Sequence, residues 1–388
     1  MKNIFETLEL LEKHIMPLKE SEIVSLENAL GRVLACDLYA KKNLPSFDNA
    51  ALDGYAFNYD DINAPLKIMG VILAGDKTPY KLEKNECFKI MTGALMPKNA
   101  DTILMLEDEN LENGFLAIKT KPKRFNAFRF KGEEQKEGEL LLKKGQKLNA
   151  AMITLLAAQG IYKIEVIRKP RIAIFSSGDE LKEPWQMCDE LSIYNANALA
   201  VQALLKDYDS CYLGIIKDEF NATKKALQNS QFDLIITSGG ASVGEADFMD
   251  RALKELKFKE IFNELKARPA KPTKLYQKDN KLILILPGNP MAAFLSCFIF
   301  ATKILNLLSG NLEKECKINA LMGEDLKLKA GRNNLILGNL ENGIFTPFNN
   351  NHFGSAMILP LVKSKFLLIS DEKQESILKG ESIQLIYL

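Results

Sequence analysis

With 388 residues the chain is longer than one ordinary hydrophobic core requires, so about two to four domains are expected. It is 47% hydrophobic and 26% charged, as water-soluble globular proteins are, and its formal net charge is +1. That balance gives no overall electrostatic reason to expect nucleic acid or an anionic membrane surface as a partner.

The cysteines and histidines exclude several kinds of site. Six cysteines are scattered without a C-x-x-C pair, which predicts neither a disulfide framework nor a zinc site. Two histidines are too few for a zinc site with three histidine ligands. No signal peptide is expected from the amphipathic, acidic start. The longest apolar stretch, Met291 to Leu308, contains polar residues. It is predicted to fall short of a membrane span and to form a mostly buried helix. Together these features lead us to expect a cytoplasmic protein.

The N-terminal part combines helical patterns with a turn-rich segment. Apolar residues recur at helical spacing within 3–19, and a second short helix is predicted over 25–34. Residues 44–57 hold many turn formers together with two carboxylates, Asp48 and Asp53. Pattern alone favours a surface turn in which these carboxylates bond to nearby backbone.

Short β-like runs separated by turns predict a β-rich domain over 45–132. This domain is inserted into a discontinuous N-terminal helical and linker domain, which comprises residues 1–44 and 133–168. One of its turns, at Thr92 and Gly93, presents a hydroxyl and free backbone N–H groups, but by pattern it is an ordinary turn.

Residues 169–310 alternate short apolar strands with helical patterns. The strands do not alternate polar and apolar residues, which is typical of strands buried on both faces of a parallel sheet. Their order predicts a doubly wound α/β sheet with helices on both faces. The predicted strands are 172–175, 212–216, 234–236 and 282–286. A small β domain is predicted over 311–388, so the fold class is a multidomain combination of α/β and β with the doubly wound sheet at its centre.

Polar loops follow these strands and should converge at the carboxyl edge of the sheet, where ligands bind in open α/β folds. The loop from Thr237 to Asp247 is rich in glycine and serine and suits an anion, although it matches neither a Walker A loop nor a dinucleotide fingerprint. Asp247 would either cap the next helix or hold Mg²⁺. The carboxylates of Asp179, Glu180 and Asp218 follow neighbouring strands, and their mutual repulsion favours a bound cation.

Two proline-containing segments add further candidates. Arg268, Lys271 and Lys274 lie in a segment stiffened by prolines, which suits phosphate or a molybdate-like oxyanion, although a surface charge run is the simpler interpretation. Pro287 and Pro290 frame a rigid elbow between a strand and a helix.

Five segments in order resemble the molybdopterin molybdenumtransferase family, which includes MoeA proteins and the gephyrin E domain. They are 45–56, 91–94, 175–181, 238–247 and 286–290. The resemblance implies an α/β domain of the molybdopterin-binding type. It also implies that molybdate is inserted into adenylylated molybdopterin with Mg²⁺-dependent release of AMP, giving molybdenum cofactor.

The resemblance further implies an elongated homodimer, whose site lies between the sheet domain of one subunit and the first segments of the other. The molybdopterin adenylyltransferase and acceptor molybdoenzymes are further candidate partners. No nucleic acid and no membrane is expected.

The resemblance implies roles for individual residues. The implied catalytic residues are Asp53, Glu180, Asp218 and Asp247, and the implied Mg²⁺ ligands are Asp218, Asp247 and Glu180. The implied substrate-binding residues are Thr92, Arg129, Ser238, Gly239, Gly240, Ser242, Gly244, Arg268, Lys271, Pro287, Pro290, Arg332 and Ser355. Within this set we expect Asp218 and Asp247 at the metal–phosphate end, and Glu180 and Asp53 near the dithiolene and the oxyanion.

Two positions depart from the family pattern. Glu134 replaces a usual aspartate, and Glu264 stands where lysine is common. The second change leaves the choice between molybdate and tungstate open. Two rival functions also remain: a molybdopterin adenylyltransferase that uses ATP, and a non-catalytic scaffold like gephyrin relatives. The segments 1–168 and 311–388 weigh against the first, and the lack of an extended linker weighs against the second.

Overall fold

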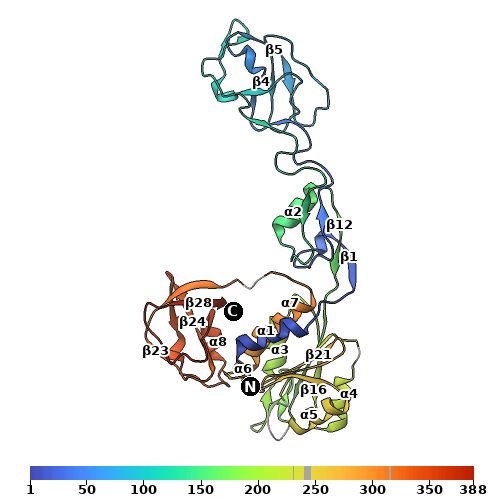
Figure 1. Ribbon diagram of the computed structural model, residues 1–388, viewed down its shortest axis with the longest axis vertical. Coiled ribbons are helices and arrows are strands. Elements are labelled where there is room, and N and C mark those ends of the chain that lie inside the picture. Colours follow the sequence, from blue (N-terminus) through green and yellow to red (C-terminus); the bar gives the residue numbers. More distant parts are fainter. Residues whose placement is uncertain (230, 240–245, 314–315) are drawn as a thin grey trace.

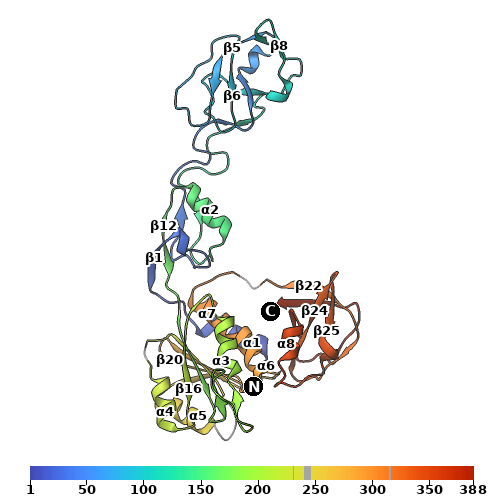
Figure 2. The ribbon, with the colours of Figure 1, turned by 180° about the vertical axis from the view of Figure 1, so that it is seen from behind.

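The computed structural model describes residues 1–229, 231–239, 246–313 and 316–388. The molecule is elongated, as Figure 1 shows, with a broad base that carries the α/β domain and the C-terminal β domain side by side. A smaller middle domain rises from the base and carries a β-rich distal domain at its far end. These two domains together form the arm of the molecule, and the view from behind in Figure 2 shows the same order.

The first helix, α1 (Ile4–His14), belongs to the base. Asn3 caps it by accepting a hydrogen bond from the backbone N–H of Glu6, and the Glu6 carboxylate accepts one from the N–H of Asn3. Ile4 and Leu11 are fully buried in the same core as the α/β sheet. The predicted division, which placed all of residues 1–44 in the N-terminal domain with 133–168, therefore needs a correction at its start, because burial of the apolar face decides where a helix packs.

The middle domain is built from two separate stretches of chain. Strand β1 (Ser21–Ser25) pairs with β12 (Lys163–Ile167), β2 (Leu38–Tyr39) pairs with β11 (Leu140–Leu142), and α2 (Ala150–Ala158) packs beside them. The helix predicted over 25–34 is wrong: only the 3-10 turn η1 (Leu26–Asn28) forms. Gly31 adopts φ +74°, a left-handed conformation that ends any helix there.

The distal domain is a six-stranded sheet in the order β7-β4-β6-β5-β9-β8. The strands are β4 (Gly54–Phe57), β5 (Leu66–Ile72), β6 (Glu86–Ile90), β7 (Thr102–Met105), β8 (Leu111–Glu112) and β9 (Phe115–Leu116), with the 3-10 turns η2 (Tyr59–Asp61) and η3 (Leu106–Asp108). A short ladder between β3 (Asn49–Ala50) and β10 (Phe128–Arg129) belongs to the same domain, and Ala50 and Phe128 pack into its core.

The predicted doubly wound sheet is confirmed. Four parallel strands lie in the order β16-β13-β17-β21: β16 (Asp209–Ile216), β13 (Arg171–Ser177), β17 (Leu234–Ser238) and β21 (Lys281–Leu286). Helix α3 (Ala196–Leu204) and α6 (Pro290–Ser296) share one buried core with α1, whereas α4 (Phe220–Leu227) and α5 (Ala246–Glu255) contribute to the core on the opposite face. Two antiparallel strands, β20 (Lys274–Lys278) and β18 (Lys259–Asn263), extend the sheet beyond the prediction.

The long apolar helix is part of this core. It runs through α6, a π-helical segment (Cys297–Ala301) and α7 (Thr302–Leu308). Contrary to the prediction, Pro290–Leu308 is by length and hydropathy sufficient to cross a membrane, but 67% of this window is buried inside the protein. The predicted burial is confirmed, and the packing identifies a core helix.

The C-terminal domain is a small closed barrel. Its strands pair in the order β24-β25-β22-β28-β26, and β26 pairs again with β24. They are β22 (Ile318–Met322), β24 (Asn333–Glu341), β25 (Ile344–Pro347), β26 (Phe366–Ile369) and β28 (Ser382–Tyr387), with the minor elements β23 (Leu326–Lys327), β27 (Ser376–Ile377), η5 (Phe348–Asn351) and α8 (Leu359–Lys363). Strand β19 (Ala267–Arg268), from the α/β part of the chain, pairs with β24 and ties the two domains of the base together.

Candidate functional site

Four parallel strands end at the same carboxyl edge of the sheet. The strand order changes direction between the neighbours β13 and β17, because the chain runs from β13 to β16 on one side and from β17 to β21 on the other. Such a switch point is the usual ligand crevice of an open α/β sheet. The strands that end at Ser177, Ile216, Ser238 and Leu286 share this edge as predicted, while residues 240–245 of the glycine-rich loop lie outside the described residues.

Asp218 is oriented at this edge by groups from β13 and the loop after it. Its Oδ1 accepts a hydrogen bond from the Ser177 hydroxyl at 3.1 Å, and its backbone N–H donates to Asp179 Oδ1 at 3.4 Å. Asp218 is half-buried, whereas Asp179 and Glu180 are exposed. The edge therefore presents fixed oxygen ligands, with Asp218 held in place before any ligand binds.

Backbone approaches closely at the same edge, and glycine makes this possible. Gly239 adopts φ +96°, and a Cβ there would lie 2.2 Å from the carbonyl oxygen of Ser177. The Nδ2 group of Asn197, on α3, donates to Ser238 Oγ and to the carbonyl of Gly288, both at 2.7 Å. Asn197 thus joins the ends of β17 and β21, and a larger residue at 239 would overlap Ser177 at the end of β13.

Several predicted site residues lie beside these contacts or beyond what the structure describes. Pro287 is buried at the end of β21, and Pro290 is the first residue of α6. The Glu180 carboxylate lies against Gly178, where a Cβ would come within 2.7 Å of it. The predicted Gly240, Ser242 and Gly244 are outside the described residues; Asp247 lies in the first turn of α5, but its side chain is not described.

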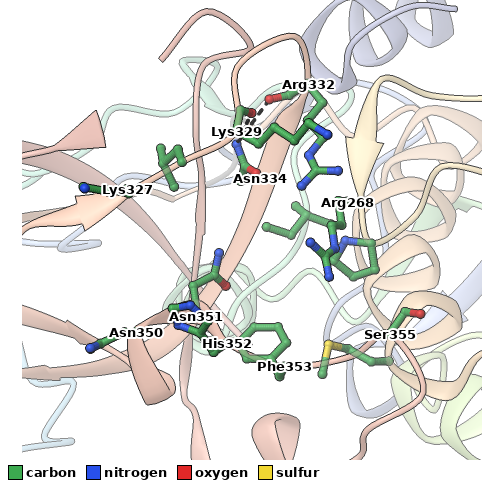
Figure 3. Close-up of a pocket in the computed structure, with 14 residues that line it drawn as sticks. Arg268, Lys327, Lys329, Arg332, Asn334, Asn350, Asn351, His352, Phe353 and Ser355 are labelled. Atoms are coloured by element: carbon green, nitrogen blue, oxygen red, sulfur yellow. Dashed lines mark hydrogen bonds between the residues drawn. The ribbon is translucent and has the colours of Figure 1, made fainter. Parts of the chain in front are cut away.

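A pocket of about 320 Å³ adjoins this edge, between the α/β domain and the barrel. It is called the arginine pocket below, because Arg268 and Arg332 line it. Pairing of β19 with β24 sets Arg268 opposite Asn334, and Figure 3 shows the guanidinium groups of Arg268 and Arg332 directed into the same space. Burial and the neighbouring Arg268 lower the pKa of Arg332. The Arg332 Nε–H is buried and has no hydrogen-bond partner in the described part of the chain.

The wall of this pocket is cationic and polar. Lys327, Lys329 and His352 also line it, and the lining contains no carboxylate among the residues that the structure describes. Ser355 accepts a hydrogen bond from Asn289 Nδ2 at 2.8 Å, which connects the pocket to the loop after β21. A cationic pocket with an unpartnered N–H donor suits a small oxyanion.

The two lysines of the proline-containing segment, Lys271 and Lys274, have carboxylate partners. Lys271 Nζ lies 3.8 Å from Glu264 Oε2 in an exposed pair, so the residue that departs from the family pattern sits beside a predicted binding lysine. Lys274 is buried and pairs with Asp250 of α5 at 3.2 Å, and Asp250 also accepts a hydrogen bond from Tyr276 at 3.0 Å. Neither lysine lines the arginine pocket.

A third group of predicted residues lies far away on the distal domain. Asp53 Oδ1 accepts hydrogen bonds from the Thr92 hydroxyl at 2.7 Å and the Thr92 backbone N–H at 2.6 Å, and these bonds lower the pKa of Asp53. Arg129 is exposed on β10 of the same domain. Because β4 follows Asp53 directly, Figures 1 and 2 place this group at the end of the arm, remote from the sheet edge.

Comparisons with known proteins cover almost the whole chain. Residues 3–160 match the model of the MoeA N-terminal region (domain I and II), and residues 173–306 match that of a probable molybdopterin binding domain. A molybdopterin molybdenumtransferase of Haemophilus influenzae is 30% identical over 376 residues, which cover 94% of this chain and 93% of that protein. The chain belongs to the molybdopterin molybdenumtransferase family.

Further members of the molybdopterin molybdenumtransferase family agree with this assignment. The protein of that name from a Nostoc species is 35% identical over 308 residues, covering 75% of this chain and 70% of the relative. The crystal structure of a molybdopterin biosynthesis MoeA protein from Pyrococcus horikoshii OT3 superposes with a TM-score of 0.86 at 25% identity and covers 100% of both chains. The resemblance inferred from the five motifs is confirmed, as is the multidomain fold.

Reasoning from the sequence missed three residues that organise the site. Ser177 and Asn289 lie within the motifs that carried the family resemblance, so their position was a usable signal. Asn197 lies on α3, far from the motifs in sequence, and no local pattern marked it. The described residues contain no group of three His, Cys, Asp or Glu side chains that could hold a metal ion, but the predicted ligands Asp218, Asp247 and Glu180 stay a prediction, because the side chain of Asp247 is not described.

Proposed function

We propose that this protein inserts molybdenum, supplied as molybdate, into adenylylated molybdopterin, with Mg²⁺-dependent release of AMP and formation of molybdenum cofactor. Family membership supports the role in molybdenum cofactor biosynthesis and molybdenum insertion. The observation that carries the finer proposal is the pairing of an anion-suited sheet edge with an adjoining arginine pocket, connected through Asn289 and Ser355.

The arginine pocket would receive molybdate. An oxyanion accepts hydrogen bonds only, and Arg268 and Arg332 can only donate them. The buried Nε–H of Arg332 gains a partner when an oxyanion binds, and the repulsion between the two guanidinium groups is relieved. These residues hold and desolvate the oxyanion beside the sheet edge, where charge stabilisation is strongest.

The sheet edge would receive the phosphates of the adenylylated pterin. Ser238 and Gly239 are buried at the end of β17, and Asn197 holds the Ser238 hydroxyl at this edge through a hydrogen bond. The donor set also fits Mg²⁺, because Asp218 and Asp179 present only oxygen and Mg²⁺ needs just one or two carboxylates when substrate phosphates complete its shell. When bound, Mg²⁺ would neutralise charge on the phosphates while water cleaves the phosphoanhydride bond and AMP is released. Ser177 keeps Asp218 oriented toward that position.

A homodimer would complete the site. Asp53, Thr92 and Arg129 cannot reach the sheet edge of their own chain, because they lie at the end of the arm. A two-fold arrangement would bring the distal domain of each copy to the sheet edge of the other, since a self-complementary contact repeats itself in both directions. Asp53 stays ionised in this arrangement, because the hydrogen bonds from Thr92 stabilise its carboxylate.

The test is AMP release from adenylylated molybdopterin with Mg²⁺, in the presence and absence of micromolar molybdate. We expect molybdate to stimulate AMP release. We expect Arg332→Gln to raise the molybdate concentration that gives half-maximal stimulation by about tenfold or more, because the variant loses a charge-assisted hydrogen bond. Lys363→Gln, on the exposed surface of α8, is the matched charge control and should change nothing. AMP release at the same rate with and without molybdate, or ATP-dependent formation of the adenylate, would overturn the proposal.

A further inference from the structure

A second cationic pocket lies where the middle domain meets the base. Its volume is about 330 Å³. Leu30, Val33 and Lys147 line it from the middle domain, Lys169 lines it from the connecting chain, and the segment after α3 contributes Lys206, Asp207 and Tyr208. Asn306 and Ser309, at the end of α7, complete the wall.

This pocket is separate from the site described above. Lys206 to Tyr208 directly precede β16, and Lys169 precedes β13, so the pocket lies toward the amino ends of these parallel strands. The sheet edge with Asp218 is at the opposite, carboxyl ends. No residue of this pocket lines the arginine pocket.

The charges around the pocket are unbalanced. None of the ammonium groups of Lys147, Lys169 and Lys206 lies within 4.0 Å of a carboxylate in the described residues, and Asp207 is the one acidic residue in the described lining. Three cations facing one anion leave an excess positive charge in a concave space. Such a space attracts small anions more strongly than a flat surface does.

The neighbouring arginines show what balanced cations look like in the same region. Arg168 is clamped by Asp233 at 2.7 and 2.8 Å and by Glu20 at 2.5 Å, and Arg32 pairs with Glu22 at 2.5 Å. Each arginine at this junction thus has a carboxylate of its own. The lysines of the pocket differ from them in having none.

The remaining wall suits an organic phosphate. Asn306 can donate through its amide nitrogen, because its Oδ1 already accepts a bond from Asn311 at 3.3 Å. The hydroxyls of Ser309 and Tyr208 add further donors, while Leu30 and Val33 offer an apolar surface. We propose that this pocket binds a phosphate-bearing small molecule, and that the bound anion bridges the middle domain to the base.

Bridging follows from where the cations come from. Lys147 belongs to the middle domain and Lys206 to the base, so an anion between them joins the two domains. The arm carries Asp53 and Thr92 at its end, and its orientation would then depend on the anion. The binding itself does not rest on the proposed function, because none of the residues of the pocket takes part in it.

The test follows the methyl resonances of Leu30 and Val33 in the full-length protein during titration with inorganic phosphate, pyrophosphate and AMP at constant ionic strength. We expect saturable shifts, at least tenfold weaker binding in Lys147→Gln/Lys206→Gln, and severalfold tighter binding in Asp207→Asn. The matched control, Lys225→Gln/Lys254→Gln, removes the same charge from exposed positions on α4 and α5.

The three probes separate the sources of the phosphate. Saturation by inorganic phosphate alone would assign a simple anion site, whereas tighter binding of AMP would assign an organic phosphate that also uses the apolar wall. Linear shifts, equal shifts with chloride, or identical binding in the lysine variant and its control would overturn the site. Asp207→Asn keeps the test decisive if the lysine variant folds poorly.

Discussion

At the end of the arm, hydrogen bonds from Thr92 stabilise the charged form of the Asp53 carboxylate. The Thr92 hydroxyl and backbone N–H both donate to Asp53, and the pKa of Asp53 is lowered in consequence. Because the folded-state pKa is below the ordinary value, the associated stabilisation is present above the ordinary carboxyl pKa and is lost as pH falls through the folded pKa.

Replacing Thr92 separates the two donors. We expect Thr92→Val to raise the pKa of Asp53 toward its ordinary value, since only the backbone bond remains, whereas Thr92→Ser should keep it low. A ¹³C NMR titration of the Asp53 carboxyl measures both. An unchanged pKa in Thr92→Val would show that the hydroxyl does not stabilise the carboxylate.

A second residue-scale prediction concerns the closest backbone approach at the sheet edge. Gly239→Ala should lower the free energy of unfolding by about 1–3 kcal/mol from backbone strain alone, with more from the contact with Ser177. Gly288→Ala is the matched control, because its Cβ would lie 4.0 Å from the nearest atom and cause no overlap. Denaturant unfolding of both variants checks this, and equal stability would contradict the geometry.

At the scale of elements, the chain connecting the arm to the base is fixed by Arg168. Its two hydrogen bonds to Asp233 hold the connection against the start of β17, and the Asp233 carboxylate also accepts from the backbone N–H of Arg171 at 2.8 Å. Burial alone would raise the pKa of Asp233, but the bonds from Arg168 lower it overall.

We expect Arg168→Gln to reduce the free energy of unfolding by about 1.5–3 kcal/mol at neutral pH, as loss of hydrogen bonds to a charged group does. The difference from wild type should shrink as pH falls through the folded pKa of Asp233, because protonation of Asp233 weakens in the wild type the charge-assisted bonds that the variant already lacks. The matched control is Lys224→Gln, which breaks a more exposed pair with Glu255 and should cost under about 1 kcal/mol. A pH-independent difference would contradict the assignment.

Local patterns predicted elements well where burial is uniform and poorly where tertiary contacts decide. The apolar run before Ser177 has no alternation, so it identified a central parallel strand. Strands β18 and β20 carry charged residues at the sheet margin and gave no such signal. The apolar spacing within 25–34 matched a helix, but Gly31 adopts a left-handed conformation and Val33 forms an isolated β-bridge with Lys147 instead.

The site was predicted in part for the same reason. Motif residues at strand ends, such as Asp218 and Ser238, converge because the carboxyl ends of parallel strands share an edge. Pairing of β19 with β24, which creates the arginine pocket, joins residues more than sixty positions apart and leaves no local trace. The distance between Asp53 and the sheet edge is likewise a property of the whole arm.

At the scale of the whole molecule, the elongated shape separates the two halves of the proposed site. The distal half carries Asp53 and the basal half carries Asp218, and one chain cannot bring them together. If the site is shared between two copies, two inactive variants that are altered in different halves should complement each other in a mixed dimer. Each copy in a mixed dimer can supply what the other lacks.

The most direct measurement is molybdate-stimulated AMP release by Asp53→Asn, by Asp218→Asn and by their equimolar mixture after subunit exchange. We expect each variant alone to be nearly inactive. The mixture should recover about a quarter of wild-type activity, because half of the dimers are mixed and one of their two sites is intact. A mixture no more active than either variant alone, or full activity in a single variant, would contradict the shared site.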